Sequence, residues 1–261
     1  MNRKRLFMLA VSAAFLLVAC SQTVSPPKDE DESEDPISVT ENNRSSAVQS
    51  SSSATAGEWD WSLPRDSYLN SDIEYGVLTD SRDKQEYKTV QIGEQTWMAQ
   101  NLNYKYKDEE ESFCYDGRED YCAVAGRLYT WDAVQYSENI CPKGWHVPSR
   151  EEFIQLLTDV GGTVWNNGDT IAPALKSRIG WRPINGVDGN GTDDFGFSAI
   201  PAGQRPEPGK PHHVGGLGTF RTSTEYNDSS AYVLDLNTAG DLVLVDLGPK
   251  TYAFSIRCLK D

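Results

Sequence analysis

Apolar and polar residues alternate over many short stretches between residue 75 and the C-terminus, and this period-two pattern predicts β-strands. Gly, Pro, Asn and Asp separate the stretches, as expected of turns between strands. Residues 80–83, Asp-Ser-Arg-Asp, form one such turn and predict a hairpin of the two stretches beside it. The predicted strands cover residues 75–79, 87–92, 96–98, 195–200, 219–224, 231–236, 242–247 and 254–259.

Two stretches carry helical spacing instead. The first is residues 128–136, and the second begins at Ser149, which precedes Glu152 by three residues and predicts a capping box. Gly161 and Gly162 are expected to end this second helix. Its apolar stripe consists of Phe153, Leu156, Leu157 and Val160. Because strands and about two helices occur without regular βαβ alternation, we predict an α+β fold of short, mostly antiparallel strands.

The N-terminus carries an export signal. Basic residues 2–5 precede an apolar stretch at 6–18 and small residues, which is typical of a signal peptide rather than a transmembrane helix. Cys20 follows directly, and the arrangement resembles a bacterial lipobox, in which the Cys is acylated and becomes the first residue after cleavage. The alternative is an ordinary secreted protein with a chance Cys. Ser21, where an Asp would favour the inner membrane, implies an outer-membrane lipoprotein; whether it faces the cell surface stays open.

Composition divides the rest of the chain. After the signal at 1–19, residues 20–57 hold an acidic run and a Ser-rich run with almost no large apolar side chains, which predicts a disordered tether. Aromatic residues become frequent from Trp59, so we expect a lead-in segment at 58–75 and one domain at 76–261. The lipid on Cys20 would make the membrane a partner of the protein, and the tether would hold the domain away from the membrane surface.

The charge excludes one class of partner. Cleavage after residue 19 removes Arg3, Lys4 and Arg5, which takes the formal net charge from −15 to −18. Nucleic-acid binding needs clustered Lys and Arg, so we expect no nucleic-acid partner.

Four cysteines remain after Cys20, and an even number in an exported chain predicts two disulfides. The alternative is a zinc site, but the chain has no Cys-x₂-Cys pair and its three His lack ligand spacing. Three pairings are open. We favour a short loop, Cys114–Cys122, and a long staple, Cys141–Cys258.

Five segments together resemble the Fibrobacter succinogenes major paralogous (FISUMP) domain over about residues 76–261. They occur in the family's order at residues 87–104, 126–131, 141–149, 191–203 and 255–258. One departure is the segment 221–225, Arg-Thr-Ser-Thr-Glu, where relatives usually carry aromatic residues before the Ser-Ser/Thr-Thr-Glu element. The resemblance implies a C-type-lectin-like fold, in which an early helical Cys pairs with one in the last strand, as in Cys141–Cys258. It implies no particular chemistry.

The loop at 188–194 is a candidate calcium site, because four of its residues alternate as oxygen ligands do. They are Asp188, Asn190, Thr192 and Asp194. An EF-hand is excluded, since its sixth and twelfth positions hold Asp193 and Ala199 instead of Gly and Glu. The alternative is a turn closed by Asx side chains. No other cofactor is expected.

Two further sets of residues are candidates. Asp193, Asp194 and Glu225 could supply a carboxylate pair for glycoside hydrolysis. His212 and His213 lie in a Gly- and Pro-rich loop at 203–218 and could bind a ligand, as could Glu225, although a solvated loop is the alternative.

These features together predict a lipoprotein that presents a non-catalytic, lectin-like domain. Its expected role is adhesion to a polysaccharide, a glycoprotein or a partner surface protein. The alternatives are a structural or assembly component of the envelope and, third, a polysaccharide-acting enzyme using Asp193, Asp194 and Glu225.

Overall fold

The computed structural model describes residues 59–106, 111–135, 140–162, 171–207, 209–240 and 243–261. The chain divides into two units, residues 1–50 and 51–261, and all described residues fall in the second. The predicted signal peptide, Cys20 and the tether therefore lie outside the described residues. Within the described residues, no helix is both long and apolar enough to span a membrane.

A five-stranded antiparallel sheet has the order β1-β2-β3-β10-β6. The predicted hairpin at residues 80–83 is confirmed as the β1–β2 connection, and a second tight turn, at residues 93–94, connects β2 to β3. The strand nearest the C-terminus, β10, is inserted between β3 and β6, so the end of the chain completes this sheet. The strands are β1 (Gly76–Thr79), β2 (Glu86–Ile92), β3 (Gln95–Met98), β6 (Trp145–His146) and β10 (Leu259–Lys260).

A second antiparallel sheet contains three strands in the order β7-β8-β9. It confirms the predicted strands at 219–224 and 231–236, and the one at 242–247 from residue 243 onward. A small sheet, β4-β5, completes the strand pairing of the described residues. The bounds are β4 (Ser112–Phe113), β5 (Leu128–Tyr129), β7 (Leu217–Glu225), β8 (Ser230–Asn237) and β9 (Val243–Pro249).

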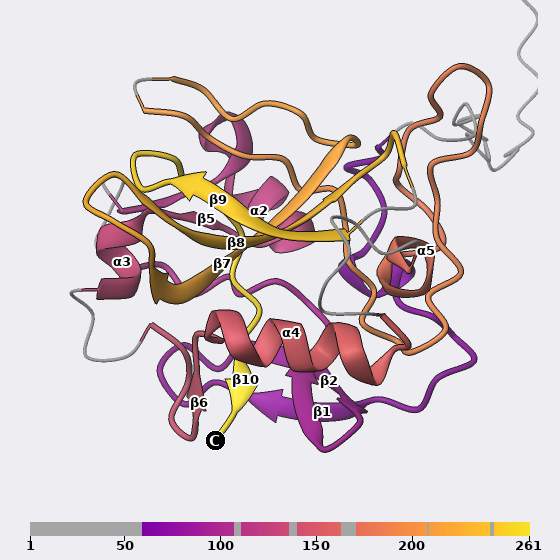
Figure 1. The fold of residues 1–261 in the computed structure, drawn as a ribbon, viewed down its shortest axis with the longest axis horizontal. Coiled ribbons are helices and arrows are strands. Elements are labelled where there is room, and N and C mark those ends of the chain that lie inside the picture. Colours follow the sequence, from indigo (N-terminus) through magenta and orange to yellow (C-terminus); the bar gives the residue numbers. More distant parts are fainter. Residues whose placement is uncertain (1–58, 107–110, 136–139, 163–170, 208, 241–242) are drawn as a thin grey trace, which may run out of the picture. The chain divides into compact units, whose positions relative to one another are not determined.

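Helix α4 (Arg150–Asp159) lies between the two larger sheets (Figure 1). Its predicted capping box is confirmed, because Ser149 and Glu152 each accept the other's backbone N–H. The apolar stripe faces the main core, where the Phe153 ring lies 5.1 Å from the Trp97 ring of β3. Burying a side chain of this size stabilises a fold by about 1.5–3 kcal/mol, so the stripe holds both sheets against the helix.

The predicted α+β class is confirmed, whereas the number of helices and one helix prediction need correction. The described residues contain four α-helices where we expected about two, and the stretch 128–136 is not one helix. Leu128 and Tyr129 pair with β4 instead, and the Thr130 hydroxyl then accepts the backbone N–H of Ala133 at 3.3 Å to begin α3. The remaining helices are α2 (Glu119–Ala125), α3 (Trp131–Gln135), α5 (Ala172–Leu175) and two 3₁₀ turns, η1 (Arg65–Tyr68) and η2 (Tyr115–Gly117).

Two strand predictions are wrong. Residues 195–200 form a turn with a single bridge at Ala199, because the buried Asp193 carboxylate accepts the backbone N–H of Ser198 at 2.7 Å and Ser198 takes a positive φ of 50°. In the stretch 254–259, the chain bridges to different partners at successive residues. Phe254 pairs with Tyr129 and Ser255 with Phe220 before β10 begins.

Both predicted disulfides are confirmed: Cys114 bonds Cys122, and Cys141 bonds Cys258. The second bond is buried, with Cys141 and Cys258 exposing 1% and 0% of their surface. It ties the segment before β6 to the segment before β10 inside a second core cluster.

Candidate binding site: two joined cavities

Two cavities adjoin beside β4 and the loop at residues 203–216, and they share Phe113 and Arg205. The first has a volume of about 600 Å³ and the second about 810 Å³. Volumes of this size are ordinary for ligand sites. We call the first the basic cavity and the second the acidic cavity, after the charges that line them.

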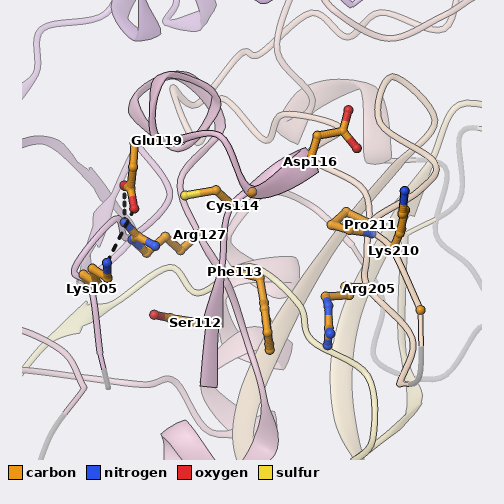
Figure 2. A pocket seen from close by; sticks show the side chains of 12 residues that line it. Lys105, Ser112, Phe113, Cys114, Asp116, Glu119, Arg127, Arg205, Lys210 and Pro211 are labelled. Atoms are coloured by element: carbon orange, nitrogen blue, oxygen red, sulfur yellow. Dashed lines mark hydrogen bonds and ion pairs between the residues drawn. The ribbon is translucent and has the colours of Figure 1, made fainter. Parts of the chain in front are cut away.

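The basic cavity gathers four cationic side chains against two acidic ones. Figure 2 shows Glu119, Arg127 and Lys105 joined on one side of the view, and Arg205 and Lys210 on the other. Glu119 forms close ion pairs with Arg127 and, at 3.8 Å, with Lys105. The Arg127 side chain is only 5% exposed, and its buried Nε has no hydrogen-bond partner among the described residues. The charged residues are Lys105, Arg127, Arg205, Lys210, Asp116 and Glu119.

Arg205 lines both cavities and is held in place from two directions. Its backbone N–H donates to the Ala253 carbonyl at 3.0 Å, and the Ala253 N–H donates back at 2.7 Å. Its guanidinium carbon lies 3.7 Å from the centre of the Phe113 ring, a cation–π contact. Among the residues that the structure describes, the Arg205 side chain has no hydrogen bond or ion pair, so its N–H groups are available to a ligand.

The acidic cavity is lined mainly by carboxylates, hydroxyls and an amide. Glu225, at the end of β7, forms a close ion pair with Lys250. Trp131 is only 5% exposed, and the Lys250 Nζ lies 5.2 Å from its ring centre, so the indole is not an open stacking surface. The polar residues are Glu111, Thr130, Asp132, Gln135, Arg205, Glu207, Glu225, Asp228, Lys250 and Thr251.

The predicted calcium ligands line neither cavity, and the loop uses their oxygens internally. The Asp188 carboxylate accepts the Asn190 N–H at 3.0 Å, and the Asn190 side-chain oxygen accepts the Trp181 N–H at 2.9 Å. The Thr192 hydroxyl donates to the Asp194 carboxylate at 2.8 Å. These are the turn-closing contacts of the alternative interpretation, and a cation would compete with each donor. The calcium site stays a prediction.

Within the described residues, one group of three potential metal-ligating side chains lies close together: Cys114, Glu119 and Cys122. Metal binding by Cys needs a free thiolate. The two sulfur atoms are bonded to each other, so this group does not supply those ligands.

The predicted carboxylate set is not gathered in either cavity. Glu225 lines the acidic cavity, whereas Asp193 and Asp194 line neither. Asp193 is fully buried and accepts both the N–H and the hydroxyl of Ser198, at 2.7 and 2.6 Å. Burial raises its pKa to about 6. Asp193 therefore closes a turn of the fold.

His212 and His213 directly follow Pro211, which lines the basic cavity, but neither His lines it. The loop doubles back here, since Gln204 and His212 exchange backbone hydrogen bonds of 3.0 and 2.8 Å. Burial, with a smaller effect of neighbouring His213, lowers the pKa of His212. The loop that we singled out does supply the site, but through Arg205 and Lys210. Sequence reasoning missed both, and also Phe113 and Arg127.

The comparisons with known proteins give one match. Neither curated proteins nor solved structures yield a relative of this chain. The model of the family described as Fibrobacter succinogenes major domain matches residues 90–260, which is more than half of the chain. The five ordered segments fall largely within this range. The chain therefore belongs to the Fibrobacter succinogenes major domain family.

Proposed function

We propose that the domain is a non-catalytic binding module that holds an extracellular polymer along the two joined cavities. The observation that carries the proposal is their junction at Phe113 and Arg205. Each cavity alone would suit one small ligand, whereas an extended chain can place successive units in both. Carboxylates, hydroxyls and amides are the groups that hydrogen-bond sugar hydroxyls, which favours a polysaccharide or the glycan of a glycoprotein.

Binding is favoured over hydrolysis because of how the carboxylates are held. Glycoside hydrolysis needs a carboxylic acid whose raised pKa keeps it protonated beside the scissile bond. Burial raises the pKa values of Asp193 and Asp235, but neither residue lines a cavity. In the cavities, the carboxylates of Glu119 and Glu225 are engaged in ion pairs with Arg127 and Lys250.

The cellular setting is part of the same proposal. The signal at residues 1–19, acylation of Cys20 and the tether at 20–57 would attach the domain to the outer membrane and extend it from the lipid surface. A module presented in this way can adhere to polymer outside the cell. If the tether instead faced the periplasm, the same cavities would serve envelope assembly.

The test is a depletion assay of the full chain, solubilised in mild detergent, against neutral, carboxylated and sulfated polysaccharides and a mucin-type glycoprotein. The cavity variant is the double substitution Asp132→Asn and Asp228→Asn, because both side chains are exposed and line the acidic cavity. Glu94→Gln, an exposed carboxylate in the β2–β3 turn, is the matched control.

We expect at least one polymer to bind, and the double variant to bind it at least about tenfold more weakly, since hydrogen bonds to charged groups contribute about 1.5–3 kcal/mol. The control should bind as the unaltered chain does. Binding that ignores the double substitution, or no binding to any polymer, would contradict the proposal. If the chain released soluble sugar from a polymer and Asp132→Asn abolished that release, the domain would be an enzyme instead of a binding module.

A further inference from the structure

The side chains that line the basic cavity have a net positive charge, whereas the chain as a whole has a net negative charge. The sequence has 39 acidic and 24 basic residues, yet this cavity is lined by four basic residues and only two acidic ones. Glu119 already pairs with two of the four cations, Arg127 and Lys105. Arg205 and Lys210 have no ion pair within the described part of the chain. The surplus positive charge therefore lies on the Arg205 side.

Two arginines that line this cavity have side-chain donors without acceptors among the described residues. One is Arg127, whose Nε is itself buried, and an unsatisfied buried donor is rare in a folded protein. Arg205 has its guanidinium fixed over Phe113 and its backbone fixed to Ala253, while none of its side-chain donors is used by a described residue. A planar guanidinium held in this way is suited to two parallel hydrogen bonds with an oxyanion.

We propose that the basic cavity binds an anionic group, a carboxylate or a sulfate, carried by the polymer, with Arg205 as its main ligand. This inference rests on the proposed function and specifies the class of polymer. Lys210 also lines the cavity, is exposed, and adds a second cation for the anionic group.

The neighbouring cavity limits how densely the polymer is charged. It is lined by five carboxylates, two of them on Asp132 and Asp228, and its cations are Arg205 and Lys250. Lys250 is already paired with Glu225. An anionic unit placed there would meet like charges at short range, which a partly enclosed site screens poorly. The acidic cavity therefore accepts a neutral unit, and the preferred polymer carries anionic units that are separated by neutral ones.

The test measures affinities of the full chain for four soluble polymers by isothermal titration. They are a neutral xylan, the same backbone with scattered glucuronic acid units, the same backbone with scattered sulfate groups, and polygalacturonate, in which every unit is charged. We expect one or both sparsely charged polymers to bind about tenfold or more tightly than the neutral xylan and polygalacturonate. The carboxylate and sulfate arms identify which anion the cavity takes.

Arg205→Gln should remove this preference, so that the sparsely charged polymers bind no more tightly than neutral xylan does. Arg205→Lys should restore only part of it, because a lysine cannot form the two parallel hydrogen bonds. The matched control is Arg150→Gln, since Arg150 lies 4.9 Å from the Tyr232 ring in a similar cation–π contact but lines neither cavity. The control should keep the full preference.

Equal affinity for neutral and sparsely charged polymers would overturn the inference while leaving the proposed function intact. Tightest binding of polygalacturonate would overturn the spacing argument. If none of the four polymers binds, the proposed function is contradicted as well. Tighter Arg205-dependent binding of poly-glutamate than of any polysaccharide would reassign the cavity to acidic protein partners.

Discussion

Removing the Cys141–Cys258 disulfide should destabilise the domain much more than removing Cys114–Cys122. The two bonds span sequence separations of 117 and 8 residues. In the chain-entropy model, these loops stabilise the fold by about 4.9 and about 2.5 kcal/mol, because a longer loop confines more of the unfolded chain. The first loss is a large part of the roughly 5–15 kcal/mol that typically holds a domain together.

The assay is equilibrium unfolding in urea of two double variants, Cys141→Ala with Cys258→Ala and Cys114→Ala with Cys122→Ala. Replacing both partners leaves no unpaired thiol, and alanine adds no polar group to the buried site. We expect the free energy of unfolding to fall by about 2 kcal/mol more in the first variant than in the second. Equal losses, or a larger loss from the short loop, would refute the reasoning.

Two further predictions concern α4 and its surroundings. Ser149→Ala should lower the free energy of unfolding by about 1 kcal/mol, measured in urea, because it removes one side of the capping box; an unchanged midpoint would contradict this. The second concerns pH. Burial alone would lower the pKa of His146, but its hydrogen bonds to Asp261 and Glu152 outweigh burial and raise this pKa above 6.5. Burial alone would raise the pKa of Glu152, but the hydrogen bonds that its carboxylate accepts outweigh burial and lower this pKa below 4.5. Stability from this cluster is therefore largest between pH 4.5 and 6.5, and is lost as pH rises through the pKa of His146 or falls through that of Glu152. His146→Gln should flatten the alkaline side of a stability–pH profile; parallel profiles would count against the cluster.

Features encoded locally were predictable from the sequence. The alternation of residues 87–92 and 231–236 suits strands with one face against a core, and Ser149 with Glu152 marks a helix start by itself. The disulfide pairing was favoured through loop size, a property of the chain alone. The fold class and the strands of the second sheet, though not their pairing, follow from these patterns.

Side-chain contacts with the backbone and tertiary packing account for the errors. Residues 195–200 have a strand-like composition, but the Asp193 carboxylate takes a backbone N–H that a ladder would have used. The site was missed because its residues are far apart in the sequence. Phe113 and Arg205 are 92 positions apart, and only the tertiary fold lays one over the other. Attention therefore fell on His212 and His213, which are conspicuous in sequence but lie outside both cavities.

The most direct test of the account is a structure of the full chain bound to a tetrasaccharide that carries one glucuronic acid among neutral units. We expect the carboxylate of the sugar on Arg205 in the basic cavity, and an adjacent neutral unit beside Asp132 in the acidic cavity. A ligand found elsewhere, such as on the loop at 188–194, or one whose acidic unit lies among the carboxylates of the acidic cavity, would contradict it.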